Sequence, residues 1–127
     1  MKKGLLFTLV LIAMLCVSPC GYSATDVFAG TGVADYNSAT GCDIRSNTAK
    51  TVCDIDINKG TNAVINWQHF NIPEAHKMNF NFANSNLYAL NKVSTGVSRI
   101  AGELNSYGGG TVIVSSPIAF PKAIPPL

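Results

Sequence analysis

Two short segments alternate strictly between apolar and polar residues, and this period of two constrains the fold more than any other feature of the chain. Residues 53–57 are Cys-Asp-Ile-Asp-Ile, and residues 78–82 are Met-Asn-Phe-Asn-Phe. Because successive side chains of a strand point to opposite faces, each segment is expected to form a half-buried strand. Asp54 and Asp56 then lie on the solvated face, and a role as calcium ligands is the alternative.

Further short strands are expected about every ten residues along the rest of the chain. They fall at residues 64–67, 87–93, 100–104 and 111–114. The last of these, Thr-Val-Ile-Val, is apolar and β-branched, which predicts a strand buried on both faces. Residues 25–51 are rich in Gly, Ser, Thr, Asn and Asp and are expected to form loops and short irregular strands. Since no helix-length amphipathic segment intervenes, the pattern predicts an all-β fold.

The alternation fails around the only tryptophan, Trp67. In residues 63–72 (AVINWQHFNI) neither parity gives a continuous apolar face, which predicts a corner between Trp67 and Phe70. The interior is expected to hold Trp67, Phe70 and Ile72, and the corners Asn66 and Asn71. The alternative for Trp67 and Phe70 is an exposed platform for stacking on sugars, although filling a small core is the favoured role.

Two all-β architectures fit this pattern. Short strands with asparagines near their ends favour a right-handed parallel β-helix, in which such residues stack from one coil to the next. A small β-sandwich is the alternative, because periodicity alone does not separate the two.

The N-terminal 23 residues have the pattern of a secretory signal peptide: a basic start, an apolar run too short to span a membrane as a mature helix, and small residues at the end. Cleavage after Ser23 is favoured over cleavage after Ala24. A lipoprotein anchored at Cys20 is a further alternative, disfavoured by the proline before it. The expected organisation is a signal peptide at 1–23, one domain at 24–120 and a Pro-rich tail at 121–127.

Removal of the leader also removes the net charge. Without Lys2 and Lys3, the nine Lys and Arg residues become seven, equal to the seven Asp and Glu residues. A near-neutral chain with no basic run gives no support to nucleic acid or an anionic membrane as a partner.

The mature chain keeps two of the four cysteines, Cys42 and Cys53. A pair of cysteines in an exported chain predicts a disulfide, which would stabilise the fold by about 3 kcal/mol if unstrained. Two reduced thiols are the alternative.

No motif for catalysis or cofactor binding is present. His69 and His76 lack a third ligand at metal spacing. The glycines at 30, 32 and 108–110 lack the residues that complete a dinucleotide or phosphate loop, and no Gly-x-Ser-x-Gly elbow occurs. We therefore expect a non-enzymatic protein with no metal and no cofactor.

Five segments in the second half of the chain carry a family resemblance. In order, they are AVINWQHFNI, MNFNF, YALNKV, SRIAGELNS and GGTVIV. Their order and spacing resemble the secretion domain of two-partner-secreted exoproteins, the filamentous-haemagglutinin type. That domain has an Asn-Trp-x-x-Phe-x-Ile core, a Phe strand, Ala-Leu-Asn-Arg-Val, Ile-x-Gly-x-Leu and a Gly-x-Val strand.

The resemblance implies a right-handed β-helix at the start of an exported adhesin, haemagglutinin or toxin, reaching the surface through the periplasm of a Gram-negative-type bacterium. Its expected partner is an outer-membrane transporter that recognises the domain through POTRA modules. The matching positions are Asn66, Trp67, Phe70, Asn71, Ile72, Ala89, Leu90, Asn91 and Val93. Since family members continue well past the position of Leu127, a truncated fragment without function is also considered. The alternative function is a small secreted carbohydrate- or surface-binding β protein.

Overall fold

The computed structural model describes residues 24–116, and these are all-β, with no helix among them. The expected signal peptide at 1–23, its Cys20 and the Pro-rich tail at 121–127 lie outside the described residues. The strands are β2 (Thr25–Asp26), β3 (Ala34–Thr40), β4 (Asp43–Ser46), β5 (Val52–Ile57), β6 (Ala63–Phe70), β7 (Lys77–Phe82), β8 (Tyr88–Val93), β9 (Glu103–Tyr107) and β10 (Thr111–Ser115). The predicted all-β class is confirmed.

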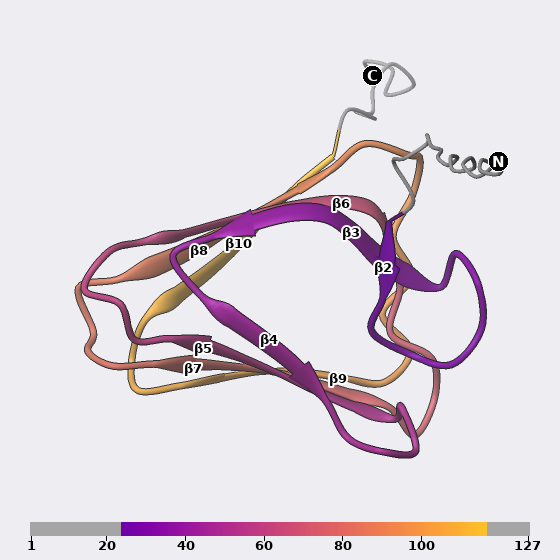
Figure 1. Cartoon of the computed structure of the whole chain (residues 1–127), viewed down its shortest axis with the longest axis horizontal. Helices are drawn as coiled ribbons and strands as arrows, with labels where there is room; N and C mark the ends of the chain where they lie inside the picture. Colours follow the sequence, from indigo (N-terminus) through magenta and orange to yellow (C-terminus); the bar gives the residue numbers. More distant parts are fainter. Residues whose placement is uncertain (1–23, 117–127) are drawn as a thin grey trace, which may run out of the picture.

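The strands form two open sheets that face each other across the core (Figure 1). The five-stranded sheet has the order β10-β8-β6-β3-β2, and the four-stranded sheet has the order β4-β5-β7-β9. Pairs that involve β2, β3 or β4 are antiparallel. All pairs among the later strands are parallel.

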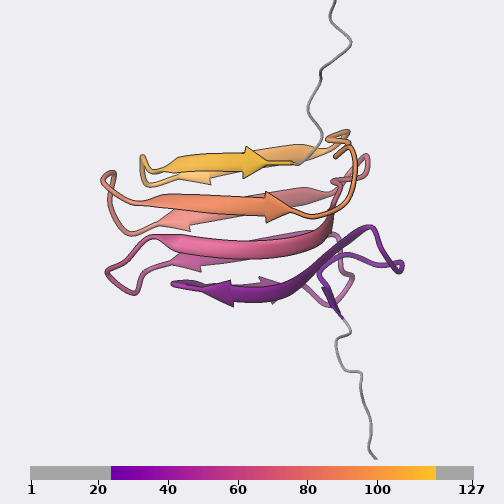
Figure 2. The same cartoon turned by 90° about the horizontal axis from the view of Figure 1, so that it is seen from above.

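From β5 onward the chain passes alternately between the two sheets. Strands β5, β7 and β9 enter the four-stranded sheet, while β6, β8 and β10 enter the five-stranded sheet. Each pass therefore adds one strand parallel to the previous strand of the same sheet, and Figure 2 shows the resulting stack from above. We call the pairs β5–β6, β7–β8 and β9–β10 the three layers.

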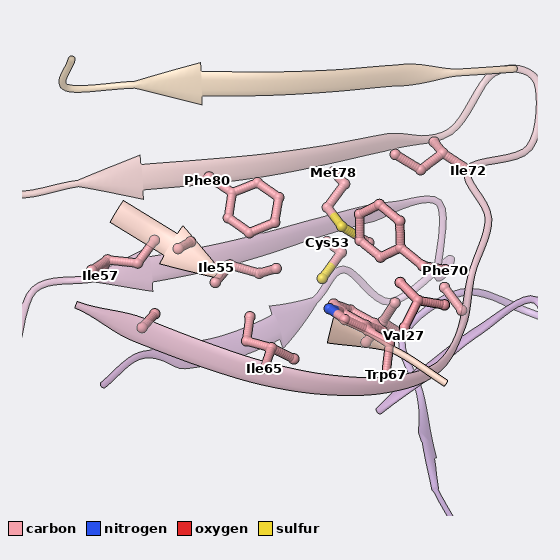
Figure 3. Packing of buried hydrophobic residues seen from close by; sticks show 14 of the residues in the cluster. Val27, Cys53, Ile55, Ile57, Ile65, Trp67, Phe70, Ile72, Met78 and Phe80 are labelled. Carbon is pink, nitrogen blue, oxygen red and sulfur yellow. The ribbon is translucent and has the colours of Figure 1, made fainter. Parts of the chain in front are cut away.

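The alternating segments found in the sequence supply one wall of the core. Strands β5 and β7 bury every second residue, and the register stacks these residues between layers. The opposite wall comes from β6 and β8, and Figure 3 shows the two walls in contact. The buried side chains of these four strands are Cys53, Ile55, Ile57, Ala63, Ile65, Trp67, Phe70, Met78, Phe80, Phe82, Ala89, Asn91 and Val93. Each large apolar side chain contributes about 1.5–3 kcal/mol on burial.

The parity conflict in residues 63–72 has a different cause from the predicted corner. Strand β6 continues unbroken to Phe70, but its pairing with β3 skips Gln68: Tyr36 is opposite Trp67 and Asp35 is opposite His69. This β-bulge shifts the alternation by one residue, because the extra residue has no partner. Trp67 and Phe70 therefore both point into the core.

The two ends of the stack differ. At one end, β3 and β2 extend the five-stranded sheet, and β4 is the edge strand of the four-stranded sheet. At the other end, β9 and β10 are the outermost strands (Figure 2). The prediction that residues 111–114 are buried on both faces is wrong, since Ile113 and Val114 are each 41% exposed at this edge. A hydrophobic run does not reveal whether a strand is central or terminal.

Candidate functional site

The Asn-Trp-x-x-Phe-x-Ile segment mostly fills the core. Trp67 and Ile72 are fully buried and Phe70 is 1% exposed. The rings of Trp67 and Phe70 pack edge to face with centroids 5.0 Å apart, and the rings of Tyr36 and Trp67 pack in the same way at 5.8 Å. The prediction of interior positions for Trp67, Phe70 and Ile72 is confirmed. The alternative of a sugar-stacking platform on Trp67 and Phe70 is wrong, because neither ring reaches the surface.

A buried asparagine holds the indole of Trp67 in place. The Trp67 Nε1–H donates to Asn91 Oδ1 at 2.8 Å, and both residues are 0% exposed. The Asn91 amide donates in turn to the carbonyl oxygens of Ile113 at 3.1 Å and Ala89 at 3.3 Å. One side chain thus joins β6, β8 and β10, one strand from each layer. A buried polar group is tolerated only when it is bonded in this way.

The two asparagines predicted at corners have different positions. Asn71 follows the end of β6 and does lie at a corner. Its Nδ2 donates to the carbonyl oxygen of Val33 at 2.9 Å, and its Oδ1 accepts from the Arg99 backbone N–H at 2.9 Å. Asn66 lies within β6, where its amide donates to Ser38 Oγ at 2.8 Å, so its predicted corner position is wrong.

The second motif divides between the two faces of β8. Ala89, Asn91 and Val93 point inward, whereas Leu90 is half-buried on the outer face. Of all the motif residues, Asn66, Asn71 and Leu90 therefore keep solvent-accessible surface, while the others are buried. Sequence matching did not distinguish these two groups, because burial depends on the strand parity and on the bulge.

The outer face of the five-stranded sheet presents two parallel rows of side chains. The register aligns Val64, Leu90 and Ile113 in one row, which we call the apolar row. A second row, the polar row, consists of Asn66, Lys92 and Ser115. Neighbouring strands are about 4.8 Å apart, so each row offers regularly spaced contacts.

The outer face of the four-stranded sheet is polar and internally bonded. Asn79 donates to Asp54 at 3.1 Å, and Asn105 of the next layer donates to Asn79 at 2.9 Å. Asn81 donates to Asp56 at 2.9 Å, and the Nε of Arg45 donates to the same carboxylate at 3.1 Å. The predicted solvated face of Asp54 and Asp56 is confirmed.

The electrostatics of Asp56 follow from these bonds. Partial desolvation raises its pKa, but the hydrogen bonds from Arg45 and Asn81 outweigh this and hold the pKa of the Asp56 carboxyl below its usual value.

Among residues 24–116, no group of three His, Cys, Asp or Glu side chains is arranged to hold a metal ion.

The two histidines have separate environments. His69 Nδ1 lies 2.9 Å from Asp35 Oδ1, and the same carboxylate oxygen accepts from the His69 backbone N–H at 3.0 Å. His76 Nδ1 lies 3.0 Å from the Glu74 carbonyl oxygen, and its ring packs edge to face on Phe28. Sequence reasoning missed the His69–Asp35 pair, because the two residues are 34 positions apart and meet only through the β3–β6 register.

The structure contradicts the predicted Cys42–Cys53 disulfide, since both residues are free thiols. Strands β4 and β5 pair Ser46 with Cys53 but Asp43 with Asp56, so Cys42 lies at the opposite end of this pair from Cys53. At about 3.3 Å per residue, the separation is on the order of 10 Å or more, beyond the Cα–Cα range that a disulfide spans.

Comparisons with known proteins give no match: none was found among family models, curated proteins or solved structures. A search of the described part of the chain for a helix of membrane-spanning length and hydrophobicity likewise found none.

Proposed function

We propose that the chain is the N-terminal secretion domain of a two-partner-secreted exoprotein, folded as a right-handed parallel β-helix. In this proposal the protein is exported to the cell surface, has no enzymatic activity, and is recognised by the POTRA modules of an outer-membrane transporter. The main support is the path of the chain: it alternates between two sheets, and each strand from β5 onward pairs in parallel with the strand of the same sheet in the next layer.

The positions of the motif residues support this proposal. Trp67 and Asn91 belong to different motif segments, yet they form one buried hydrogen bond between successive layers. Ile72, from the same segment as Trp67, and Ile100, from the Ile-x-Gly-x-Leu segment, form a parallel bridge. Gly102 of the Ile-x-Gly-x-Leu segment lies where a Cβ would come within 2.3 Å of the carbonyl oxygens of Pro73 and His76. The family pattern thus corresponds to the contacts that stack one layer on another.

Stacked layers also suit export in an extended form. A layer that buries its apolar face only against the next layer gains little stability alone, so the chain stays unfolded until several layers are present. An extended segment can then add to the edge of a POTRA sheet through main-chain hydrogen bonds, with alternate side chains giving selectivity. Asn66 and Leu90 are candidates for such side chains, since they do not form the core.

Binding to isolated POTRA modules tests the proposal. The exported chain would be labelled and titrated with the isolated POTRA modules of a two-partner secretion transporter from the same organism, and binding would be followed by fluorescence anisotropy. Asn66→Ala and Asn71→Ala should each weaken binding about fivefold, the equivalent of one hydrogen bond of about 1 kcal/mol. Asn105→Ala is the matched control, because Asn105 lies on the other sheet outside the Asn-Trp segment. No binding by the unchanged chain would refute the proposal, and equal binding by all three variants would remove the motif from recognition.

A further inference from the structure

The two cysteines beyond residue 23 are close in sequence, but strands β4 and β5 keep them apart. Only ten residues separate Cys42 from Cys53. Ser46 pairs with Cys53, whereas Asp43, the residue after Cys42, pairs with Asp56 near the other end of β5. At about 3.3 Å per residue, the two Cα atoms are on the order of 10 Å apart or more. A disulfide needs a Cα–Cα distance of about 4.4–6.8 Å, so the folded chain cannot hold this bridge.

Cys42 is held in its place by strand β3. Strand β3 ends at Thr40, which is paired with β6, and only Gly41 lies between Thr40 and Cys42. The backbone at Gly41 has a positive φ of 77° and is packed so closely that a Cβ there would overlap the carbonyl oxygen of Asn62. Cys42 therefore cannot move towards Cys53 unless β3 leaves β6.

Cys53 is held from the other side, by strand β7. It pairs with Met78, and its side chain is 0% exposed in the core, where Figure 3 shows it among the other buried residues. Moving Cys53 towards Cys42 would break the parallel β5–β7 pair, on which the next layer stacks. Detaching the four residues of β4 is therefore not enough to form the bridge. Either β3 has to leave β6, or β5 has to leave β7.

The unfolded chain imposes no such separation on the two thiols. A flexible segment of about ten residues closes in about 10–100 ns, and short loops lose little entropy on closure. Exported proteins also meet oxidants that convert neighbouring thiols into disulfides. The Cys42–Cys53 bridge is therefore accessible to the unfolded chain but not to the folded one.

We infer that Cys42 and Cys53 form a redox switch of folding: the reduced chain folds, whereas a disulfide between them prevents the β3–β6 and β5–β7 pairs from forming together. The switch is set by thiol–disulfide exchange with an oxidant that is itself a disulfide, such as glutathione disulfide. The S–S bond of the oxidant breaks, the bond between Cys42 Sγ and Cys53 Sγ forms, and the two thiol protons leave with the two thiols released from the oxidant. Reduction by a dithiol reverses the exchange and lets the chain fold.

The fold protects its thiols from oxidation in turn. Burial raises the pKa of Cys53 to about 12 and that of Cys42 to about 11, and the thiolate is the form that attacks a disulfide. Since the bridge and the fold exclude each other, each disfavours the other by the same factor. A folded chain therefore resists oxidation, and a bridged chain resists folding. This inference does not depend on recognition by a transporter.

Refolding of the bridged and the reduced chain tests the switch. The exported chain, unfolded in urea and dilute, would be oxidised with glutathione disulfide, and mass spectrometry would select the monomer that has lost both thiol hydrogens. After dilution from urea, the reduced chain should regain the far-UV circular dichroism of β-structure and a blue-shifted Trp67 emission. The bridged chain should stay unfolded, and dithiothreitol should restore its folding.

The double variant Cys42→Ser/Ser46→Cys is the matched control. Ser46 is directly opposite Cys53, and the two side chains are hydrogen-bonded. Directly opposite residues of an antiparallel pair have Cα atoms about 4.5–5.5 Å apart, which is within the range of a disulfide. This variant should therefore fold whether its thiols are reduced or bridged. It has as many cysteines as the unchanged chain, so the two proteins differ in where the bridge lies.

The glutathione ratio that oxidises half of the unchanged chain gives a second readout. The ratio should be at least about 100-fold more oxidising in native buffer than in urea, because the free energy of folding opposes the bridge. Equal ratios in the two solvents, or a bridged unchanged chain that folds, would overturn the inference. So would a reduced chain that does not fold, or a control variant that folds when reduced but stays unfolded when bridged.

Discussion

Replacing Asn91 with leucine should destabilise the fold by leaving the Trp67 indole without an acceptor. The hydrogen bond from Trp67 Nε1 to Asn91 Oδ1 is 2.8 Å long, and both residues are 0% exposed. Water therefore cannot replace the lost acceptor unless the core rearranges. An orphaned buried donor costs about 1–3 kcal/mol. Leucine has the same number of side-chain heavy atoms as asparagine, but its methyl groups are bulkier, so overpacking adds to this cost.

A double-mutant cycle separates this cost from packing effects. Trp67→Phe removes the donor, leaves the Asn91 oxygen unpaired and opens a cavity, so it also destabilises. When both changes are combined, no polar atom of this pair remains buried without a partner. The double variant should therefore be more stable than the sum of the single changes predicts, by about 1–3 kcal/mol.

Urea unfolding followed by far-UV circular dichroism is the suitable assay, because Trp67→Phe removes the only tryptophan fluorescence. The same cycle with Asn105→Leu in place of Asn91→Leu is the control: Asn105 lies on the other sheet, so its effect should add to that of Trp67→Phe within about 0.5 kcal/mol. Additivity in the Asn91 cycle as well would refute the claim that this hydrogen bond orders the core.

Two further predictions concern a close backbone contact and the thiols. Gly102→Ala should lower the free energy of unfolding by about 3 kcal/mol, because its Cβ would come within 2.3 Å of two carbonyl oxygens. Gly96→Ala is the control: a Cβ there has no atom within 4 Å, so the free energy of unfolding should change by less than about 0.5 kcal/mol. Equal melting temperatures of the two variants would contradict this prediction. Burial, helped by nearby carboxylates, raises the pKa of Cys42 to about 11 and that of Cys53 to about 12, from 9.0, so at pH 8 alkylation of Cys42 should be about 100-fold slower in the folded chain than in urea. These raised pKa values stabilise the fold below pH 9, and the benefit should be lost as the pH rises towards 12.

The strands that the sequence predicts best are those whose side-chain pattern is set locally. Residues 53–57 and 78–82 alternate because one face of β5 and of β7 lies on the core and the other faces solvent, and this requirement applies whichever strands lie beside them. The interior positions of Trp67, Phe70 and Ile72 were predictable for a different reason: few large apolar side chains are available to fill a small core.

Features that depend on strand order were not predictable from local patterns. Strand β3, with seven residues, lies in the segment expected to form loops and short irregular strands. Its polar sequence forms this strand through backbone pairing with β6 rather than through an apolar face. The exposure of β10 depends on its place at the end of a sheet. The absence of the Cys42–Cys53 bridge depends on the β4–β5 register. Each outcome is decided by residues far away in sequence.

The asparagines show which sequence signal would have revealed that register. Only Asn66 and Asn71 were expected at corners, and Asn79, Asn91 and Asn105 lie within strands. There they bond to residues of the neighbouring layer: Asn79 to Asp54 at a separation of 25 positions, Asn105 to Asn79 at 26 positions, and Asn91 to Trp67 at 24 positions. Parallel stacking brings equivalent positions within about 4.8 Å, so a carboxamide mid-strand finds its partner one layer away. A search for polar or apolar matches at a spacing of about 25 residues would therefore have predicted both the parallel pairing and the partners of these side chains, whereas a search for turns could not.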